Sequence, residues 1–573
     1  MLLARIETTL SSLTVTLRML TMGITRKRSE EELLAMTKKP RTLRKERSPP
    51  YDSTQEQPFH AITKAKEWEA VNFWARHMHS LLSRPFRHNG DDDDIEQDLI
   101  SGIDGILLEP SPILVGVSGN CGCGKSKVLN SLFSIGEIAP SNADGGQVTV
   151  TSNEFCGRKE GQAAKYLAEV VFLSPAERHD VLAGFVRDYY GGIFQRAGAA
   201  RALLSLFKGL PECRSIDAVR RILTSAEPRG GEAVTAQLVR WADGLIAQAL
   251  GNDEIVTLTA SNEVELLSQL ATYTSEGSVH SGPSLMHCVS IVRIHFSNPL
   301  LDLGISFLDT PELNNLEVIN NISDLPKSRH ITHAMVAAKT GCLVPTVSIG
   351  TSKMQRLGSN RVVVVVTGAD QVGDNYTPRG TKDRKDTATR LKAKCVEMDA
   401  IENSLREQID ECDDCHQLPE LFQQLDETRA SIKQSHDAEK VHRIKMNNER
   451  IEARLRETLT YEGPILPLSN TEYETHFAGY LPRDAPALSV EETNIPELRR
   501  LVATFPNEIR LGEVRQLVEV VMPAQLDRLD AFVSQEGTHD RLRSGLVKVL
   551  PQARAMLDGP VRSAFDALCR DFQ

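Results

Sequence analysis

Residues 113–133 read ILVGVSGNCGCGKSKVLNSLF, and the fold expected for the whole chain follows from this stretch. An apolar run opens into a glycine-rich turn, and an amphipathic pattern comes next, which predicts a strand, a loop and a helix. The turn contains the complete spacing Gly119-x-x-x-x-Gly124-Lys125-Ser126 of a phosphate-binding loop, or P-loop. The alternative, a glycine-rich turn that binds nothing, is disfavoured by the strand before it and the helix after it.

The chemistry expected of this loop rests on backbone amides. Several N–H groups converge on one phosphate only if the backbone curls without Cβ clashes, which its glycines permit. The following helix points its positive N-terminus at the anion. Lys125 is expected to reach the β- and γ-phosphates, and the Ser126 hydroxyl to bind a Mg²⁺ ion between them. The predicted phosphate-binding residues are Gly119, Asn120, Cys121, Gly122, Cys123, Gly124, Lys125, Ser126 and Lys127.

Composition limits the class of protein. The 573 residues are 40% hydrophobic and 25% charged, a length and balance that suit two or three hydrophobic cores. No apolar run approaches membrane-spanning length, so we expect no integral membrane segment. The net charge of −11 combines about +6 in the first fifty residues with roughly −17 in the remainder, and such an acidic body gives no strong nucleic-acid signal. Ten scattered cysteines are typical of free thiols in a reducing compartment.

The N-terminal residues 1–57 are predicted to be a disordered basic tail, because they offer little apolar surface to bury. The clusters RKR at 26–28 and KKPR at 38–41 are typical of a nuclear import signal, although such clusters also occur in solvated tails. Arg5 and Arg18 among serines and threonines leave a mitochondrial signal as an alternative. We therefore expect a soluble intracellular protein of the nucleus or the cytoplasm.

Two further strands are predicted to end in carboxylates. The run 304–308 leads into Asp309-Thr310-Pro311-Glu312, and the strand 362–366 leads into Thr367-Gly368-Ala369-Asp370. A carboxylate at the end of a buried strand is where a P-loop fold holds its Mg²⁺, whereas the alternative is that Asp309 caps a turn. The carboxyl edge of the strands is also where ligands bind in open α/β sheets. A short apolar strand at 465–468 precedes Ser469-Asn470.

Helical patterns occupy most of the remaining chain. Apolar residues at helical spacing from Val71 to Leu82 predict a helix, aspartates 91–94 an acidic linker, and Ser174-Pro175-Ala176-Glu177 a helix start. Two apolar stripes in 385–460 predict a helical hairpin. The expected domains are a tail at 1–57, a leading helix and linker at 58–112, a P-loop domain at 113–475 with helical insertions at about 155–288 and 380–460, and a helical segment at 476–573.

The hairpin turn contains Cys412-Asp-Asp-Cys415-His416, which has the spacing of a haem-attachment motif. Nothing else in the sequence supports haem. A metal or redox role stays open beside the favoured interpretation, an incidental pair of thiols.

Taken in order, the P-loop, the Asp309 turn, the Asp370 turn and Ser469-Asn470 have the layout of a GTPase domain. The chain resembles the dynamin superfamily, and within it the SLIP-GC type of nuclear GTPases with their fungal and protist relatives. The likeness covers about residues 60–510. It rests on the segments GNCGCGKSKVLNSLF, AEVVFLSPAERHDVLAGFV, VRIHFSNPLLDLGISFLDTPEL, VVVVVTGAD, LSNTEYE and ETNIPELRRL.

The resemblance implies roles by position. Asp309 would be the switch aspartate on the Mg²⁺ side, and Asp370, with Thr367 beside it, would recognise the guanine ring. Ser469 and Asn470 would lie beside the base. The catalytic residues would be Lys125, Ser126 and Thr149, the last with Thr151 as the alternative switch threonine, and the metal ligands would be Ser126, Thr149 and Asp309.

Three departures from the family pattern stand out. Glu312 replaces a glycine whose N–H normally follows the γ-phosphate, and a carboxylate near a triphosphate is repulsive unless it points away. Gly368 replaces a lysine whose stem covers the base. Cys121 and Gly122 stand where dynamins carry glutamine and serine, so their catalytic arrangement does not transfer.

The sequence thus predicts an α/β fold, a P-loop GTPase domain with a mixed sheet and helices on both faces, two helical insertions, and flanking helices in a partial bundle. The expected function is Mg²⁺-dependent GTP binding with slow hydrolysis. The alternatives are a pseudo-GTPase or nucleotide-binding scaffold, and a coiled-coil interaction protein. The expected partners are guanine nucleotide, a second copy in a nucleotide-dependent homodimer, and unidentified proteins at the hairpin.

Overall fold

The computed structural model describes residues 47–88, 94–120, 122–139, 151–191, 193–225, 231–251, 253–275, 282–309, 331–353, 357, 359–372, 382–412, 417–459, 461–535 and 540–572. Several sequence predictions lie outside these residues, namely the tail to residue 46, Cys121, Thr149, Glu312, and the Cys415-His416 part of the haem-like motif. The chain divides into two compact units. The larger contains Pro50–Ala478 and Pro486–Gln573, and the smaller combines Gly479–Ala485 with the segment before Pro50.

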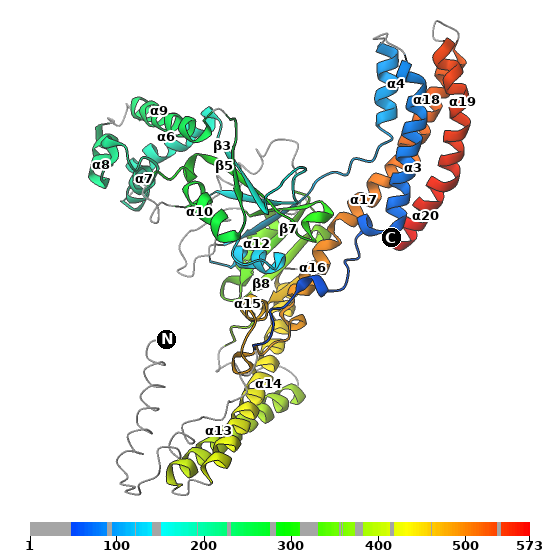
Figure 1. The fold of residues 1–573 in the computed structure, drawn as a ribbon. Helices are drawn as coiled ribbons and strands as arrows, with labels where there is room; N and C mark the ends of the chain where they lie inside the picture. Colours follow the sequence, from blue (N-terminus) through cyan, green and yellow to red (C-terminus); the bar gives the residue numbers. More distant parts are fainter. Residues whose placement is uncertain are drawn as a thin grey trace, which may run out of the picture. The chain divides into compact units, whose positions relative to one another are not determined.

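Within the described residues, nine strands form one mixed sheet (Figure 1) in the order β4-β3-β5-β2-β6-β1-β7-β8-β9. Strands β6, β1, β7, β8 and β9 run parallel, while β2 pairs antiparallel with β6. This arrangement confirms the expected α/β P-loop GTPase fold. The strands are β1 (Ile113–Gly119), β2 (Ser152–Cys156), β3 (Tyr166–Phe172), β4 (Val256–Ala260), β5 (Val289–His295), β6 (Ile305–Asp309), β7 (His333–Lys339), β8 (Val362–Thr367) and β9 (Ile465–Leu468).

The parallel strands are covered on both faces, as their continuous apolar sequences require. Val363 and Val365 of β8 belong to a core that includes α5 (Lys125–Phe133) and α16 (Ile495–Ala503). Val364 and Val366, which point the other way, belong to a core with α12 (Leu343–Lys353) and α14 (Leu418–Leu459). All six residues of β8 are therefore buried.

The first insertion is not purely helical, unlike the sequence prediction. It begins with β3 and includes β4, and these strands extend the sheet beyond β5. The predicted helix start is present, because the Ser174 N–H donates to Glu177 Oε2 at 2.7 Å and the Glu177 N–H donates to Ser174 Oγ at 3.3 Å. The helices are α6 (Pro175–Gly191), α7 (Ile193–Leu206), α8 (Ile216–Ser225), α9 (Gly231–Leu250) and α10 (Glu263–Thr274), and α6 to α9 share a core of their own.

The second insertion is a helical hairpin, as predicted. Helices α13 (Lys382–Glu411) and α14 run side by side (Figure 1). Cys395 and Leu405 of the predicted stripe are buried. The free thiols of the described chain include Cys123, Cys213, Cys288, Cys342, Cys395 and Cys569. The base of α14 packs on α12 and thereby joins the hairpin to the sheet.

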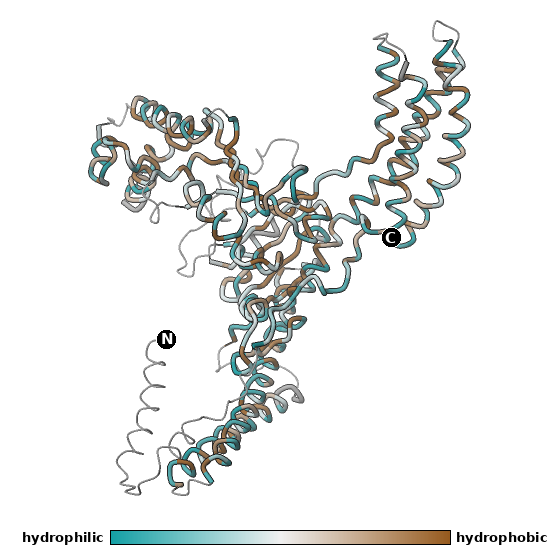
Figure 2. The backbone as a smooth tube through the Cα atoms, in the orientation of Figure 1, coloured by the Kyte–Doolittle hydropathy of each residue, from teal (hydrophilic) through white to brown (hydrophobic). Residues whose placement is uncertain are grey.

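The flanking helices form the predicted bundle, in which hydrophilic and hydrophobic residues alternate along each helix (Figure 2). The alternation lets each helix bury one side, and Val71, Met78, Leu526 and Leu546 are among its fully buried residues. None of the described helices is long and apolar enough to span a bilayer. The members are α3 (Lys66–Ser83), α4 (Asp94–Asp104), α17 (Phe505–Gln516), α18 (Met522–Ser534), α19 (Asp540–Met556) and α20 (Arg562–Phe572).

Candidate nucleotide site

The P-loop connects the carboxyl end of β1 to the N-terminus of α5, as the sequence predicts. A Cβ atom on Gly119 would lie 2.3 Å from the Ala337 carbonyl oxygen and 2.6 Å from Cys123 Sγ, so no larger residue fits there. Gly124 precedes the helix with φ of 87°, in the left-handed region that glycine adopts without strain. The two glycines therefore have distinct roles. Gly119 lets the loop backbone approach β7 closely, and Gly124 lets the chain turn into α5.

Lys125 closes the loop from inside. It is only 8% exposed, and its Nζ donates to the Gly119 carbonyl oxygen at 3.1 Å and to the Asn120 carbonyl oxygen at 3.5 Å. Both acceptors are neutral, so the ammonium charge is free to pair with an incoming phosphate. The lysine is thus held inside the loop that would surround an anion.

Thr367, at the end of β8, supports the loop from a neighbouring strand. Its hydroxyl donates to the Cys123 carbonyl oxygen at 2.5 Å, and the side chain would meet a Cβ on Gly124 at 3.5 Å. The Asn120 amide similarly donates to Thr346 Oγ1 at 2.7 Å, which fixes the loop to α12. Both contacts fix the backbone of the loop to its neighbours.

Asp309 ends β6 beside β1, in register with Val117. It is fully buried, and neither carboxylate oxygen has a hydrogen-bond partner in the part of the chain that the structure describes. Burial raises the pKa of Asp309 to about 6, while the Lys125 charge and the Ser126 hydroxyl lower it. An unpaired buried carboxylate is costly, and a cation bound by oxygen ligands would compensate it. The donor set of Asp309 and Ser126 therefore fits Mg²⁺.

The turn after β8 contains a residue in the left-handed backbone region. Gly368 has φ of 67°, and the Gln371 N–H donates to its carbonyl oxygen at 3.1 Å. This left-handed conformation strains any side chain, so a glycine at this position has a backbone reason. Asp370 lies half-buried at the end of the turn, and the Ala369 N–H donates to the Leu468 carbonyl oxygen at 3.4 Å.

Ser469 and Asn470 lie next to this turn, after β9. Both are buried, and α15 (Asn470–Ala478) begins at Asn470. Ser469 Oγ and Asn470 Oδ1 have no partner among the described residues. Asn130, a buried asparagine at the end of α5, differs because its Oδ1 accepts from the Ile138 and Ala139 N–H groups.

The fold thus gathers unpartnered polar atoms at one edge of the sheet. Buried polar atoms in native structures almost always have a hydrogen-bond partner. Several buried polar atoms without one in the same place therefore need an explanation, such as a ligand that binds there. Because parallel strands end at the same edge, the ends of β1, β6, β8 and β9 meet there. The atoms of this edge without a partner in the described chain are Ser118 Oγ, Asn120 Oδ1, Asp309 Oδ1 and Oδ2, Ser469 Oγ and Asn470 Oδ1, while others such as Thr63 Oγ1, Ser205 Oγ and His287 Nε2 lie elsewhere.

Other predicted site residues have different placements. Lys127 pairs with Glu474 at 3.4 Å, with both side chains nearly half exposed, so it points away from the loop that it follows. Thr151, the alternative switch threonine, donates its hydroxyl to the Tyr273 and Met286 carbonyl oxygens at 3.3 and 3.2 Å. It therefore has a structural role. The described residues contain no group of three metal-binding His, Cys, Asp or Glu side chains.

Sequence reasoning missed three residues at this edge. Thr346, which anchors Asn120, carries no motif, and Ser118 lies within a strand pattern that reads as wholly structural. Asn153 pairs opposite Asp309 across the antiparallel β2–β6 ladder and is buried. Asn153 could have been found from the sequence, because it is a polar residue in the strand that closely follows the predicted switch threonine.

Comparisons with known proteins add a distant similarity. No family model matches the sequence, and no curated protein matches it significantly. Two solved structures, both described as an oligomerised bacterial dynamin pair that provides a mechanism for the long-range sensing and tethering of membranes, share 12% sequence identity with the chain. The TM-scores are 0.39 and 0.38, and each alignment covers 84% of this chain. The chain spans 58% of the length of each of these proteins.

Proposed function

We propose that the chain is a dynamin-like GTP-binding protein that binds Mg²⁺-GTP and hydrolyses it slowly. One observation carries the proposal. The P-loop with its inward lysine lies at the same sheet edge as the unpartnered oxygens of Asp309, Ser469 and Asn470. These groups match the two ends of a nucleotide, phosphate and base.

At the phosphate end, the chain supplies backbone N–H groups, the N-terminus of α5 and the Lys125 ammonium. Asp309 and Ser126 would hold Mg²⁺, together with Thr149 as the resemblance implies. The bound metal would neutralise charge on the phosphate oxygens. Lys125 would stabilise charge on the transferred phosphoryl group as water attacks in line.

At the base end, Asp370 would accept two hydrogen bonds, from the N1–H and the exocyclic amine of guanine. Adenine does not present this pair of donors. Gly368 provides no apolar stem to cover the ring, so we propose weak binding that nevertheless favours GTP over ATP.

The finer assignments are part of the same proposal. The motif resemblance supports a relation to the SLIP-GC type of nuclear GTPases, and the basic cluster at 26–41 supports nuclear or cytoplasmic localisation. We propose nucleotide-dependent homodimers, with other proteins binding at the hairpin.

Binding without turnover is the second candidate function. The sequence motifs assign no residue to orient the attacking water, and Glu312 and Gly368 depart from the family pattern. A pseudo-GTPase would keep the phosphate and base contacts and lack the hydrolytic step.

Titration of the purified protein with Mg²⁺-GTP and Mg²⁺-ATP, followed by single-turnover hydrolysis, tests the proposal. We expect tighter GTP binding and slow release of phosphate. Equal affinity for the two nucleotides would contradict the guanine assignment. GTP binding without phosphate release would favour the pseudo-GTPase, and nucleotide-independent self-association without binding would favour a helical interaction protein.

A further inference from the structure

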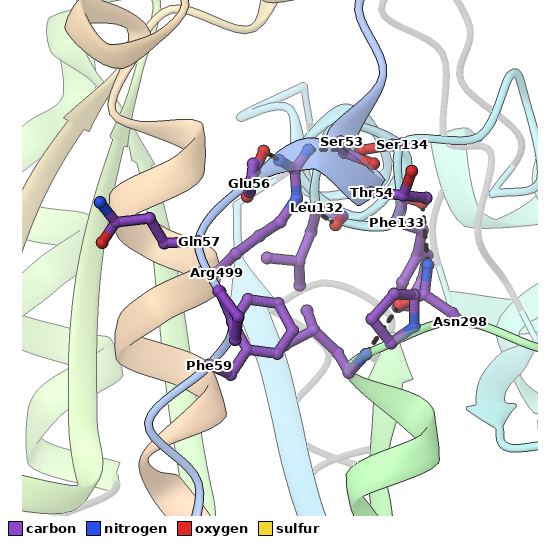
Figure 3. A pocket seen from close by; sticks show the side chains of 13 residues that line it. Ser53, Thr54, Glu56, Gln57, Phe59, Leu132, Phe133, Ser134, Asn298 and Arg499 are labelled. Atoms are coloured by element: carbon purple, nitrogen blue, oxygen red, sulfur yellow. Dashed lines mark hydrogen bonds and ion pairs between the residues drawn. The ribbon is translucent and has the colours of Figure 1, made fainter.

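Arg499 of α16 is a buried cation that joins the two ends of the candidate site through its hydrogen bonds. The residue is 3% exposed and lies against the wall of a cavity (Figure 3). Its Nε donates to the Leu132 carbonyl oxygen at 2.8 Å, and its Nη2 donates to the Ser131 carbonyl oxygen at 2.7 Å. These carbonyls belong to the last turn of α5, where backbone acceptors have no partner within the helix. The arginine therefore caps the phosphate-binding helix.

The same guanidinium contacts the helix of the base loop. Its Nη2 donates to the Tyr473 hydroxyl and to Ser134 Oγ, both at 2.5 Å, and the guanidinium carbon lies 5.1 Å from the Tyr473 ring centroid. Ser134 Oγ and the Tyr473 hydroxyl are also hydrogen-bonded to each other at 2.8 Å. Tyr473 is in the first turn of α15, the helix that begins at Asn470.

A third segment balances the charge of the arginine. Nη1 forms an ion pair with Glu56, whose side chain is also buried, and Glu56 accepts a hydrogen bond from Tyr51 at 2.9 Å. A buried guanidinium needs a charge partner of this kind, because removal of water from an unpaired ion is costly. The arginine is thus fixed from the N-terminal segment on one side and from two helices on the other.

Two cavities lie beside these bonds, and one of them lies between the two helices, where packing is incomplete. A cavity of about 180 Å³ is lined by Leu132, Asn298 and Arg499, among others (Figure 3). A second cavity of about 290 Å³ lies between α5 and α15 and is lined by Ser131 and Tyr473, among others. Because apolar contact is interrupted here, the polar bridge has a large share in setting the spacing between the helices.

We propose that Arg499 is a positioning residue for nucleotide recognition, which holds the phosphate-binding helix α5 and the base-loop helix α15 at the spacing that a nucleoside triphosphate requires. The inference rests on the proposed GTP binding. GTP contacts both ends of the site, so its affinity depends on their spacing. Inorganic tripolyphosphate contacts only the phosphate end, so its affinity does not.

The experiment compares the affinities of Mg²⁺-GTP and Mg²⁺-tripolyphosphate for the full chain and for Arg499→Gln. We expect GTP affinity to fall about tenfold and tripolyphosphate affinity to change by less than about twofold. Arg500→Gln is the matched control, because this neighbour forms surface ion pairs with Glu491 and Glu497 and keeps both affinities. Equal losses for the two ligands, or no loss for either, would overturn the proposal.

Tyr473→Phe gives an independent test if Arg499→Gln fails to fold. This change removes one hydroxyl from the bridge and keeps the ring under the guanidinium. We expect a loss of about threefold for GTP and none for tripolyphosphate. Unchanged GTP affinity in a folded Tyr473→Phe protein would contradict the inference. Failure of the proposed function has a different signature, since wild-type protein would then bind GTP no better than tripolyphosphate.

Discussion

At the amino edge of the parallel strands a buried histidine is stacked and hydrogen-bonded, whereas several buried oxygens at the carboxyl edge have no partner in the described chain. At the amino edge, His333 begins β7, stacks on Phe505 with ring centroids 4.4 Å apart, and lies 3.1 Å from Thr332 Oγ1 through Nδ1. At the carboxyl edge, Asp309 and Asn470 leave buried oxygens unpaired in the described chain. Unpaired groups of this kind reduce stability, so proteins retain them mainly where a ligand completes the site.

This contrast predicts that the two edges have different roles, one in stability and one in binding. Changes at the amino edge are expected to alter stability and leave binding intact. Changes at the carboxyl edge are expected to alter binding, and in one case to raise the stability of the ligand-free protein. Four predictions test this division, in order of decreasing effect.

Lys125→Ala has the largest expected effect. Loss of the phosphate partner should reduce the affinity for GTP and ATP alike by about 100-fold or more, since a charge-assisted bond is lost. The residue is 8% exposed and bonded to the loop, so thermal unfolding must be measured together with binding. Lys165→Ala, at a lysine whose side chain is 60% exposed and pairs with Glu263, is the control. Unchanged nucleotide affinity in Lys125→Ala would remove the P-loop from the proposed function.

His333 should make the fold sensitive to acid. Burial lowers the pKa of His333 from 6.5 to about 4, so the folded protein keeps the ring neutral. The unfolded chain binds the proton below pH 6.5, and stability therefore falls as the pH drops from 6.5 toward 4, by about 3 kcal/mol.

His333→Phe keeps a ring to stack on Phe505 and cannot titrate. Chemical denaturation at pH 7 and pH 4.5 should show that the free energy of unfolding falls less in the variant than in the wild type. GTP affinity at pH 7 should be the same in both proteins. An equal loss of stability in acid for the two proteins would mean that groups other than His333 cause the acid sensitivity.

Asp309→Asn should separate stability from binding. The change removes a fully buried charge that burial destabilises more than the nearby Lys125 and Ser126 stabilise it, as its raised pKa shows, so the free energy of unfolding without ligand should rise by about 1–3 kcal/mol. The stabilisation by Mg²⁺-GTP should shrink at the same time. Asp302→Asn, at an exposed aspartate before β6, should change neither quantity. Lower stability of ligand-free Asp309→Asn would show that the carboxylate is paired in solution.

Asp370→Asn has the smallest expected effect, because it changes only the base end. The ratio of GTP to ATP affinity should fall about tenfold, since one hydrogen-bond partner of the guanine edge becomes mismatched. Competition titrations measure this ratio directly. Tripolyphosphate affinity should remain constant, and a parallel loss of tripolyphosphate binding would place Asp370 nearer to the phosphates than to the base.

The sequence predicted elements whose signals are local. The valine run of β8, the glycine turn after β1 and the capping box before α6 each carry their pattern within a few residues. Strand β7, HAMVAAK, was missed because it lies between two other strands and is buried on both faces, so it shows no alternation. Strands β3 and β4 were also missed, because they lie within the insertion that the sequence predicted to be helical.

The candidate site divides in the same way. Lys125, Asp309 and Asp370 follow from strand ends and glycine spacing, and their placement at one edge follows from parallel strands. Thr367 and Lys127 were assigned to the ligand by their position in motifs. Their actual contacts, with the Cys123 carbonyl and with Glu474, depend on neighbours that the motifs do not contain.

The sequence by itself determined the strand, glycine turn and helix on which the proposed phosphate binding rests, because backbone curvature, helix polarity and one lysine are specified by adjacent residues. Only the tertiary structure decided which buried groups are paired. Arg499 lies 367 residues from Leu132 and 443 from Glu56, and no local pattern indicates such partners. The energy of a buried group depends on what the folded chain places around it. The unpartnered oxygens at the carboxyl edge and the hydrogen bonds of Arg499 between α5 and α15 could therefore be found only from the three-dimensional structure.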